Sequence, residues 1–398
     1  MAEVAAEPRR GDPPALSPYL RPLGWSMQQS RSTGEWYYVR TAPDGRRVRQ
    51  RESPGYGWRA VLLLAPDRAD QLFEEAEAVA VASCAADTAG QTCYICYGEG
   101  EGDVGLVRGC SCCGGNGFAH VSCLAEQAKI LYEEARENNL GNKALDERWA
   151  RWYTCGLCEQ NYHGVVRCAL GWACWKTYVE RPETDQARWF AIARRLALTQ
   201  LGLGLYKASH YEDALTVFMA ELSIKRQLGA PERFVLATQS DLARTYRSLG
   251  RLDDAMRLRR EIYSRRLELY GEEQETTILA ALNYAFFLDR LEHYAEAKSL
   301  LRRATPVARR ALGEGHMTTL MMRGCYATTL YEGPDATLDD LREAATTFEE
   351  MERTARRLLG SAHPTAKTIE RSLQKARATL RGREDRDDES LDDADDTE

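Results

Sequence analysis

The sequence predicts a mostly α-helical protein with a small N-terminal β-hairpin module, a compact cysteine-rich segment and a long solenoid of helical hairpins. Three observations carry this prediction. Helical patterns dominate from about residue 186 onward, sequence markers recur there at a nearly constant interval, and eight of the twelve cysteines lie between Cys93 and Cys158. At 398 residues the chain exceeds the usual size of one hydrophobic core, so two or three domains are expected.

The helical region contains an internal repeat. Pairs of a large residue and a glycine recur at intervals of 42, 42 and 47 residues, at Leu228-Gly229, Tyr270-Gly271, Leu312-Gly313 and Leu359-Gly360. One series of alanines recurs at 42 residues and a second at 41, 42 and 47, and the five extra residues fall between Ala327 and Ala344. Helix–turn–helix units of this period, each stacked on the next, predict about four repeats from 190 to 360. A capping helix is expected near 363–380.

The repeat pattern resembles that of tetratricopeptide repeats (TPRs). Leu201-Gly202, Tyr211, Ala214 and Phe218 fit the TPR pattern best, and the 42-residue period with loops such as LGEGHMTTL is similar to the kinesin-light-chain type. Stacked hairpins of this kind present a groove suited to an extended peptide or a helix. The resemblance therefore implies a protein or peptide partner for the repeats.

The cysteine-rich segment offers four pairs of metal ligands, namely Cys93 and Cys96, Cys110 and Cys112, His120 and Cys123, and Cys155 and Cys158. Two residues between paired cysteines let both thiolates reach one tetrahedral zinc ion at about 2.3 Å. Eight ligands predict two structural Zn²⁺ ions with no open coordination position, and hence no catalytic metal. Disulfides are not expected, because cytosolic thiols stay reduced. Cys113 is an alternative to Cys112, although the ligand spacing favours Cys112.

Ligand order and spacing resemble the RING-CH (RINGv) finger, because seven residues separate Cys112 from His120. The resemblance implies a cross-brace. One zinc would be held by Cys93, Cys96, His120 and Cys123, and the other by Cys110, Cys112, Cys155 and Cys158. A PHD finger has the same ligand order, but its spacer at this point is shorter, and a tryptophan usually occupies the position of Tyr153.

RING-CH proteins are known mainly as ubiquitin ligases, which recruit a ubiquitin-conjugating enzyme and supply no covalent catalytic residue of their own. Ile95 matches the usual hydrophobic contact of that family with the conjugating enzyme. The resemblance thus implies a ubiquitin-protein ligase whose repeats recruit the substrate. Gln127, Gly156 and Glu159 replace a common tryptophan, a common proline and a basic residue of the family. The 31-residue spacer between Cys123 and Cys155 also exceeds the family norm and predicts an inserted helix. A non-catalytic zinc-finger and TPR adaptor is therefore the alternative.

The N-terminal module rests on the segments EWYYVR and RRVRQR, which flank the turn signal Pro43-Asp44-Gly45. Gly24-Trp25, Trp36-Tyr37-Tyr38 and Pro54 resemble a WW domain. The same segments also resemble the strand pair of methyl-CpG-binding domains, in which Arg46, Arg47, Arg49 and Arg51 would read guanine edges. A plain solvated hairpin is the third interpretation.

Charge and hydropathy limit the partners and the cellular locations that we expect. Ten acidic residues and one arginine in Glu384–Glu398 contribute −9 to the net charge of −7, so this tail is predicted to be disordered and nucleic acid is not an expected partner. The polar, proline-rich N-terminus has no apolar region of a secretory signal. Apolar runs such as AVLLLAP at 60–66 are shorter than the roughly 20 residues that span a bilayer. We therefore expect a soluble, intracellular protein without a membrane partner, cytoplasmic rather than nuclear.

The predicted organisation has seven segments: a flexible arm (1–20), the β-rich module (21–60), a helical linker (61–86), the RING-CH finger (87–165), a helical connector (166–185), the TPR-like solenoid with its capping helix (186–381) and the acidic tail (382–398).

Overall fold

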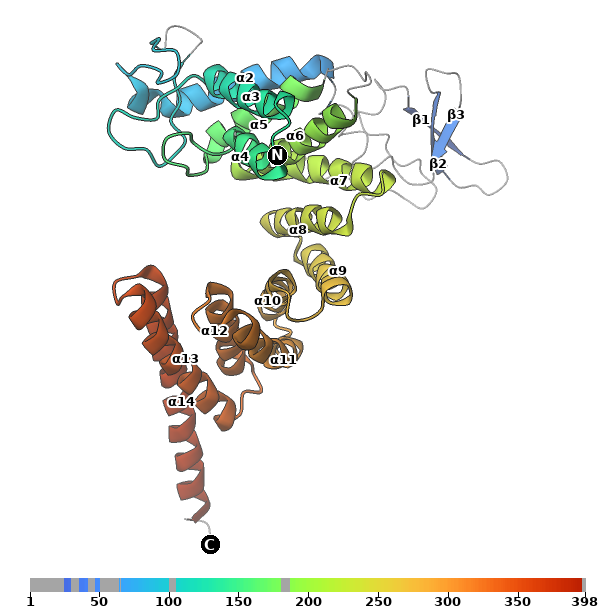
Figure 1. Ribbon diagram of the computed structural model, residues 1–398. Helices are drawn as coiled ribbons and strands as arrows, with labels where there is room; N and C mark the ends of the chain where they lie inside the picture. Colours follow the sequence, from blue (N-terminus) through green and yellow to red (C-terminus); the bar gives the residue numbers. More distant parts are fainter. Residues whose placement is uncertain are drawn as a thin grey trace, which may run out of the picture. The chain divides into compact units, whose positions relative to one another are not determined.

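The computed structural model describes residues 64, 66–99, 105–179 and 187–395, together with the backbone of three short strands between residues 25 and 50. The chain divides into two compact units, Met1–Pro231 and Glu232–Glu398. The first contains the strands and helices α2 to α7, and the second contains helices α8 to α14 (Figure 1).

The three strands form one antiparallel sheet in the order β1-β2-β3. They are β1 (Trp25–Gln29), β2 (Trp36–Thr41) and β3 (Arg47–Gln50). Tyr38 in the central strand pairs with Met27 on one side and with Gln50 on the other. The connecting residues lie outside those described, so the WW-like and methyl-CpG-binding-like interpretations of this module stay predictions.

Helix α5 forms the centre of the first unit. The helices of this unit are α2 (Pro66–Thr88), α3 (Val121–Glu137), α4 (Asn142–Trp149), the 3-10 turn η1 (Ala150–Trp152), α5 (Gly164–Val179), α6 (Ala187–Lys207) and α7 (Tyr211–Gln227). Helices α2, α3 and α6 and the turn η1 all pack against α5. Its side chains are accordingly buried on nearly every face, from Val166 to Val179.

The spacer between Cys123 and Cys155 folds as two helices and a 3-10 turn rather than as the single inserted helix that we predicted. The break after α3 contains Asn139, which has a φ of 51°. Short polar residues adopt this left-handed conformation more readily than others, so the sequence ENNLGN ends one helix and starts the next.

Aromatic side chains join this spacer to α5. The ring of Trp149 lies 4.8 Å from that of Tyr132 and 5.6 Å from that of Tyr178, measured between centroids. The Trp152 ring lies 5.9 Å from the Tyr178 ring in an edge-on arrangement. Trp152 and Tyr178 are fully buried. The spacer is therefore part of the core of the first unit, since such pairs contribute about 0.5–1.5 kcal/mol beyond the area they bury.

Two glycines allow α5 and α6 to approach closely. A Cβ atom placed on Gly171 would lie 3.0 Å from the Gln200 carbonyl oxygen, and one on Gly204 would lie 2.8 Å from the Arg167 carbonyl oxygen. Neither helix could come this close with a side chain at these positions. The helical interface is thus set by backbone-to-backbone packing.

We expect Gly204→Ala to lower the thermal stability of the chain, because the new methyl group must push α6 away from α5. Such overpacking typically costs about 1–3 kcal/mol. The matched control is Gly382→Ala in α14, where a Cβ meets no atom within 4 Å. There the same substitution should stabilise the helix by about 0.5–1 kcal/mol. Calorimetric melting of both variants checks the opposite signs, and a harmless Gly204→Ala would contradict the close approach.

Seven consecutive helices make up the second unit, and each packs against the next. They are α8 (Glu232–Ser248), α9 (Leu252–Tyr270), α10 (Glu275–Arg290), α11 (Tyr294–Leu312), α12 (Met317–Glu332), α13 (Leu338–Leu359) and α14 (Pro364–Asp395). The alanines that marked the repeat, such as Ala285, Ala297 and Ala327, are completely buried. The marker glycines Gly271 and Gly313 follow helix ends with φ of 78° and 88°, a conformation that favours glycine.

The C-terminal helix is longer than predicted. A capping helix was expected near 363–380 and disorder from 382, whereas α14 continues to Asp395. Composition indicated disorder because ten of the fifteen residues of the tail are acidic. Once α14 is anchored by its buried Ile369, Leu373 and Ala376, however, each further residue adds a backbone hydrogen bond to an existing helix at little cost. Within the described residues, no helix of either unit has both the length and the apolar character needed to cross a membrane.

Candidate metal centres

Two groups of metal-ligand side chains gather in the first unit. Within each group the ligand atoms all lie within 4.8 Å of one another, and the groups are Cys93, Cys96, His120 and Cys123, and Cys110, Cys112, Cys155 and Cys158. The first ligand pair thus lies beside the third, and the second lies beside the fourth. No other such group occurs in the part of the chain that the structure describes.

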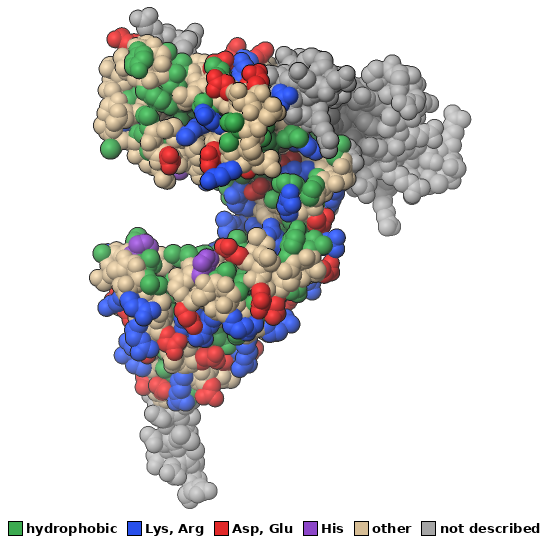
Figure 2. Space-filling view, in the orientation of Figure 1, with side chains coloured by type: hydrophobic (Ala, Val, Ile, Leu, Met, Phe, Trp, Pro, Cys, Tyr) green, Lys and Arg blue, Asp and Glu red, His purple; other side chains and the backbone are tan. Residues whose placement is uncertain are grey.

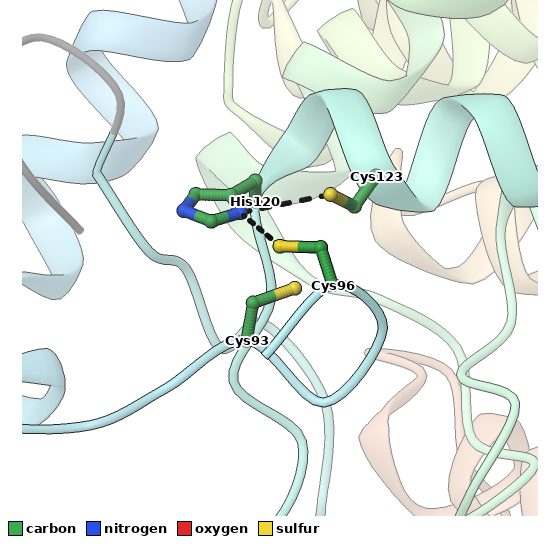
Figure 3. A group of neighbouring side chains, drawn as sticks. All are labelled: Cys93, Cys96, His120 and Cys123. Carbon is green, nitrogen blue, oxygen red and sulfur yellow. Dashed lines mark hydrogen bonds between the residues drawn. The ribbon is translucent and has the colours of Figure 1, made fainter. Parts of the chain in front are cut away.

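The first group is built from the loop after α2 and from the beginning of α3. His120 is the N-cap residue of α3, and Cys123 lies in the first turn of that helix. Figure 3 shows the three cysteine sulfurs gathered beside the imidazole ring. His120 Nδ1 lies 3.4 Å from Cys96 Sγ and 3.6 Å from Cys123 Sγ. Nδ1 is therefore the ring nitrogen that faces the sulfurs.

The two loops with two residues between their cysteines share one backbone conformation. The amide two residues after the first cysteine donates to its sulfur at 3.4 Å in both loops, from Ile95 and from Leu157. The residue after the second cysteine has a positive φ in both, 60° at Tyr97 and 58° at Glu159. Few non-glycine residues adopt this conformation. Its occurrence at matching positions indicates that both loops are shaped to direct backbone N–H groups at a sulfur.

A glycine-rich turn supplies the other half of the second group. Gly117 has a φ of 85°, and a Cβ there would lie 2.6 Å from Cys112 Cβ and 3.3 Å from Cys110 Sγ. Position 117 therefore has no room for a side chain once both cysteines face the cluster. Cys112 and Cys155 approach with their sulfurs 3.7 Å apart. The glycine at position 117 thus follows from the crowding of the two cysteines.

Sulfurs this close together oppose one another's ionisation. Burial raises the pKa of Cys110 to about 11, and burial together with neighbouring thiols raises the pKa of Cys123 to about 12. One thiol in each group has a lowered pKa instead. Burial acts to raise the pKa of Cys93, but backbone N–H donors outweigh it and lower the value to about 7. The Gln160 amide likewise lowers the pKa of Cys158 to about 7. Full ionisation of either group therefore requires a cation among the sulfurs.

The donor set fits two closed tetrahedral metal sites. Seven thiols and one imidazole are soft or borderline ligands of the kind that bind zinc, and four of them per site fill a tetrahedral coordination sphere. Carboxylates, which hard cations such as Mg²⁺ prefer, are absent from both groups. The two clusters are compatible with zinc ions, and the identity of the metal is taken up below.

The cysteines outside these groups have other surroundings. Cys113 is exposed and is not part of either group, so the structure brings Cys112 to the site in its place. Cys168 and Cys174 are buried within α5. Burial raises the pKa of Cys168 to about 12, which keeps this thiol neutral.

Exposed apolar side chains accompany the two cysteine loops. Ile95, the predicted contact residue, is partly exposed in the first loop. Leu157 occupies the matching position of the second loop and is 51% exposed, and Tyr97 is 81% exposed. Our sequence reasoning did not single out Leu157 or Tyr97. The matching spacing of the two loops was the available signal, because Leu157 stands to Cys155 as Ile95 stands to Cys93.

Two of the positions that depart from the family pattern lie together. A Cβ on Gly156 would lie 3.8 Å from Gln127 Oε1 and 3.8 Å from Tyr94 Oη. Gln127, on α3, and Gly156, on the second loop, replace the usual tryptophan and proline. This part of the finger surface is therefore less apolar than the family pattern would make it.

Comparisons with known proteins agree with this architecture. The RING-variant domain model matches residues 93–139, and the tetratricopeptide repeat model matches residues 235–275 and 277–316. The chain therefore contains a RING-variant domain and TPRs, which confirms the predicted fold class. The RING-variant match ends before Cys155 and Cys158, which the long spacer places beyond it.

Solved structures with TPR-like repeats are similar to the chain at low identity. BtubC (BKLC) from P. vanneervenii has 15% identity and a TM-score of 0.41, with 68% of this chain and 92% of that chain covered. The nearly identical TPR-like repeats of a Podosopora anserina protein described as a kinesin light chain have 16% identity and a TM-score of 0.39, with 60% and 98% covered. No match was found among curated proteins.

We expect Cys112→Ser to release one metal ion and Cys113→Ser to release none. Only the first substitution removes a ligand atom from a cluster, whereas the second changes an exposed neighbour by the same single atom. Native mass spectrometry of the two variants and the parent chain measures the number of bound ions directly. Two ions in Cys112→Ser together with one in Cys113→Ser would reverse the assignment.

Acid should release the metal. The bound form needs thiolates, and several of these thiols have pKa values raised to about 11 or 12, so metal binding displaces protons. Affinity then falls with decreasing pH, by up to about tenfold per pH unit for each proton displaced. A chromogenic chelator assay from pH 8 to pH 4.5 should show progressive release. Constant occupancy across this range would contradict thiolate ligation.

Proposed function

We propose that the chain is a zinc protein that acts as a ubiquitin-protein ligase. Zinc fits the donor set of seven thiols and one imidazole, and two such ions would close the finger. The observation that carries the ligase proposal is the pair of cysteine loops with apolar side chains at matching positions, the partly exposed Ile95 and the exposed Leu157. A RING-variant domain with this surface is suited to receive a ubiquitin-conjugating enzyme.

The proposed chemistry is one of positioning. Both clusters use four protein ligands, so neither leaves a coordination position for substrate or water. The finger would hold a charged conjugating enzyme beside a substrate lysine and would raise the rate by proximity and orientation. No nucleophile of the chain itself is required. The structural role of zinc would be to hold the two loops at fixed positions.

The repeats supply a surface for a protein partner. Helices α10 and α12 expose large apolar side chains along one side each, at Leu279 and Phe286 and at Met317 and Met321, which are between 40% and 56% exposed. Leu279 and Met321 are 42 residues apart and so hold the same position in consecutive repeats. Apolar anchors repeated in this way favour an extended or helical peptide as the ligand. We propose that this ligand is the substrate of the ligase.

A non-catalytic adaptor is the second candidate, and specific residues favour it. Glu159 is exposed directly after the last cysteine, where a basic residue would assist ubiquitin transfer. Gly156 and Gln127 reduce the apolar surface between the loops. In this alternative the zinc ions fold a protein-binding module, and the repeats hold a second protein.

Ubiquitination assays with a panel of conjugating enzymes separate the two candidates. We expect Ile95→Ala and Leu157→Ala each to reduce chain formation by at least tenfold, because interface anchors of this kind are typically worth about 2 kcal/mol. Leu140→Ala is the matched control, since Leu140 is 40% exposed in the same unit but lies between α3 and α4. No activity in the parent chain with any enzyme of the panel would favour the adaptor.

Charge reversal at Glu159 provides an independent test. If the finger positions ubiquitin, Glu159→Arg should raise the rate of ubiquitin discharge by threefold or more, because it restores the basic group. The substitution lies on an exposed loop and should leave the metal content at two ions. An unchanged or lower discharge rate in a fully metal-loaded variant would contradict this use of position 159.

A further inference from the structure

An arginine-lined pocket opens in the second unit between the end of α11, the body of α12 and the second half of α13. Its volume is about 380 Å³, and its lining consists of Arg309, Glu314, Arg323, Glu350, Arg353, Thr354 and Arg357. We call it the arginine pocket. Every lining side chain is charged or polar. Figure 2 shows basic and acidic side chains interspersed over this unit.

The two carboxylates of the arginine pocket, those of Glu314 and Glu350, are paired with arginines of the same pocket. The guanidinium of Arg323 donates to Glu314 Oε2 at 3.1 Å and to Glu350 Oε2 at 2.6 Å. Arg309 also pairs with Glu314. The side chain of Arg323 is only 6% exposed, so it forms the buried side of the pocket. Two arginines therefore balance two glutamates.

The positive charges of Arg353 and Arg357 are not balanced by a glutamate of the pocket. They lie one turn apart on α13, line the same pocket and are exposed to solvent. Among the residues that the structure describes, neither has a carboxylate partner within salt-bridge distance. Four arginines and two glutamates leave the pocket with a net charge of about +2 at neutral pH, because guanidinium groups remain protonated there. This excess charge is concentrated beside a cavity.

Comparison with the preceding repeat shows that the hairpin fold does not require arginine at three of the four positions, whereas Arg357 stands 47 residues after another arginine, Arg310. The corresponding pocket there has a volume of about 120 Å³ and is lined largely by apolar side chains. Arg309 and Arg323 stand 42 residues after Leu267 and Ala281, both of which line that smaller pocket. Arg353 stands 47 residues after Pro306 of α11. The pocket therefore occurs at an equivalent place in both repeats, and the arginines of the later repeat change which ligand it can bind.

We propose that the arginine pocket binds the phosphate group of a phosphorylated serine or threonine in a peptide ligand. A phosphate monoester carries a charge of about −1.5 to −2 at neutral pH, which matches the excess of two arginines, whereas a carboxylate carries one charge. Guanidinium groups bind phosphate oxygens through paired N–H donors. The proposal rests on the proposed role of the repeats in binding a protein partner, and it adds that phosphorylation selects that partner.

The probe is N-acetyl-phosphothreonine methylamide, titrated calorimetrically into the full zinc-loaded chain. Its unphosphorylated threonine and glutamate counterparts form the comparison. We expect the phosphorylated probe to bind at least fivefold more tightly than the glutamate probe, and the threonine probe to give no heat. Arg353→Gln/Arg357→Gln should weaken the phosphorylated probe by at least tenfold. Both side chains are exposed, so this double variant should fold.

Arg371→Gln/Arg381→Gln is the matched control. It removes the same two charges from exposed positions on α14 that do not line the pocket, and it should change affinity by less than twofold. Equal losses in both double variants would reduce the effect to bulk charge and overturn the proposal. So would equal affinity for the phosphorylated and glutamate probes. A third contrary result is a lower melting temperature of the pocket variant with unchanged probe affinity, which would assign these arginines only to the end of α13.

The outcome is separable from that of the ligase proposal. Loss of probe binding in a pocket variant that retains two metal ions and full autoubiquitination would support the phosphate site alone. Probe binding to a parent chain without ligase activity would also support the site and leave the adaptor function. Absence of probe binding in a chain that forms ubiquitin chains would overturn the phosphate site and leave the ligase proposal intact.

Discussion

The mutual repulsion of clustered thiolates is the constraint on which the first unit depends. Seven cysteines and one histidine are held in two groups whose ligand atoms lie within 4.8 Å. Such an arrangement is stable in ionised form only around a cation, so the proposed metal binding would be coupled to folding of this segment. Because the first ligand pair meets the third and the second meets the fourth, neither site can form by local folding alone. The loops become ordered together.

This constraint extends into the helices. His120 and Cys123 begin α3, so the orientation of that helix follows from the position of the first cluster. The spacer after α3 then carries Trp149 and Trp152 onto α5. Arg167 completes the connection, because its buried guanidinium contacts the Trp152 carbonyl oxygen and the Gln200 side chain on α6. Burial lowers the pKa of Arg167 to about 10 and leaves it charged at neutral pH. The finger and the first hairpin of the solenoid are therefore one packed body.

Sequence analysis was most informative for features that recur at a fixed interval, namely the helical repeat and the spacing within the ligand pairs. The intervals of 42 residues exist because Ala285 and Ala327 must be small at equivalent helix contacts, and such a pattern is visible in one sequence. The ligand pairing was accessible only through family resemblance, since spacing alone does not decide which pairs share a site. Leu157 was missed because the matching positions of the two cysteine loops were not compared, although the exposure of its side chain is visible only in the folded loop. The end of α14 was predicted too early in the sequence. Amino-acid composition says little about burial and even less about how far an existing helix continues.

The solenoid also shows how function differs from fold in a repeat protein. Each hairpin repeats the same backbone contacts, so equivalent positions in successive repeats have equivalent surroundings. Where a side chain differs from its equivalent in the preceding repeat and packing does not require the difference, that side chain can contribute to ligand binding. Leu267 and Ala281 line the pocket of one repeat, and Arg309 and Arg323 occupy the same positions in the next. Burying an arginine costs more than burying an alanine unless its charge is compensated. The glutamates that compensate Arg323 thus maintain a charged pocket where the repeat alone would form an apolar one, and binding of a charged ligand is the role that such a pocket can serve.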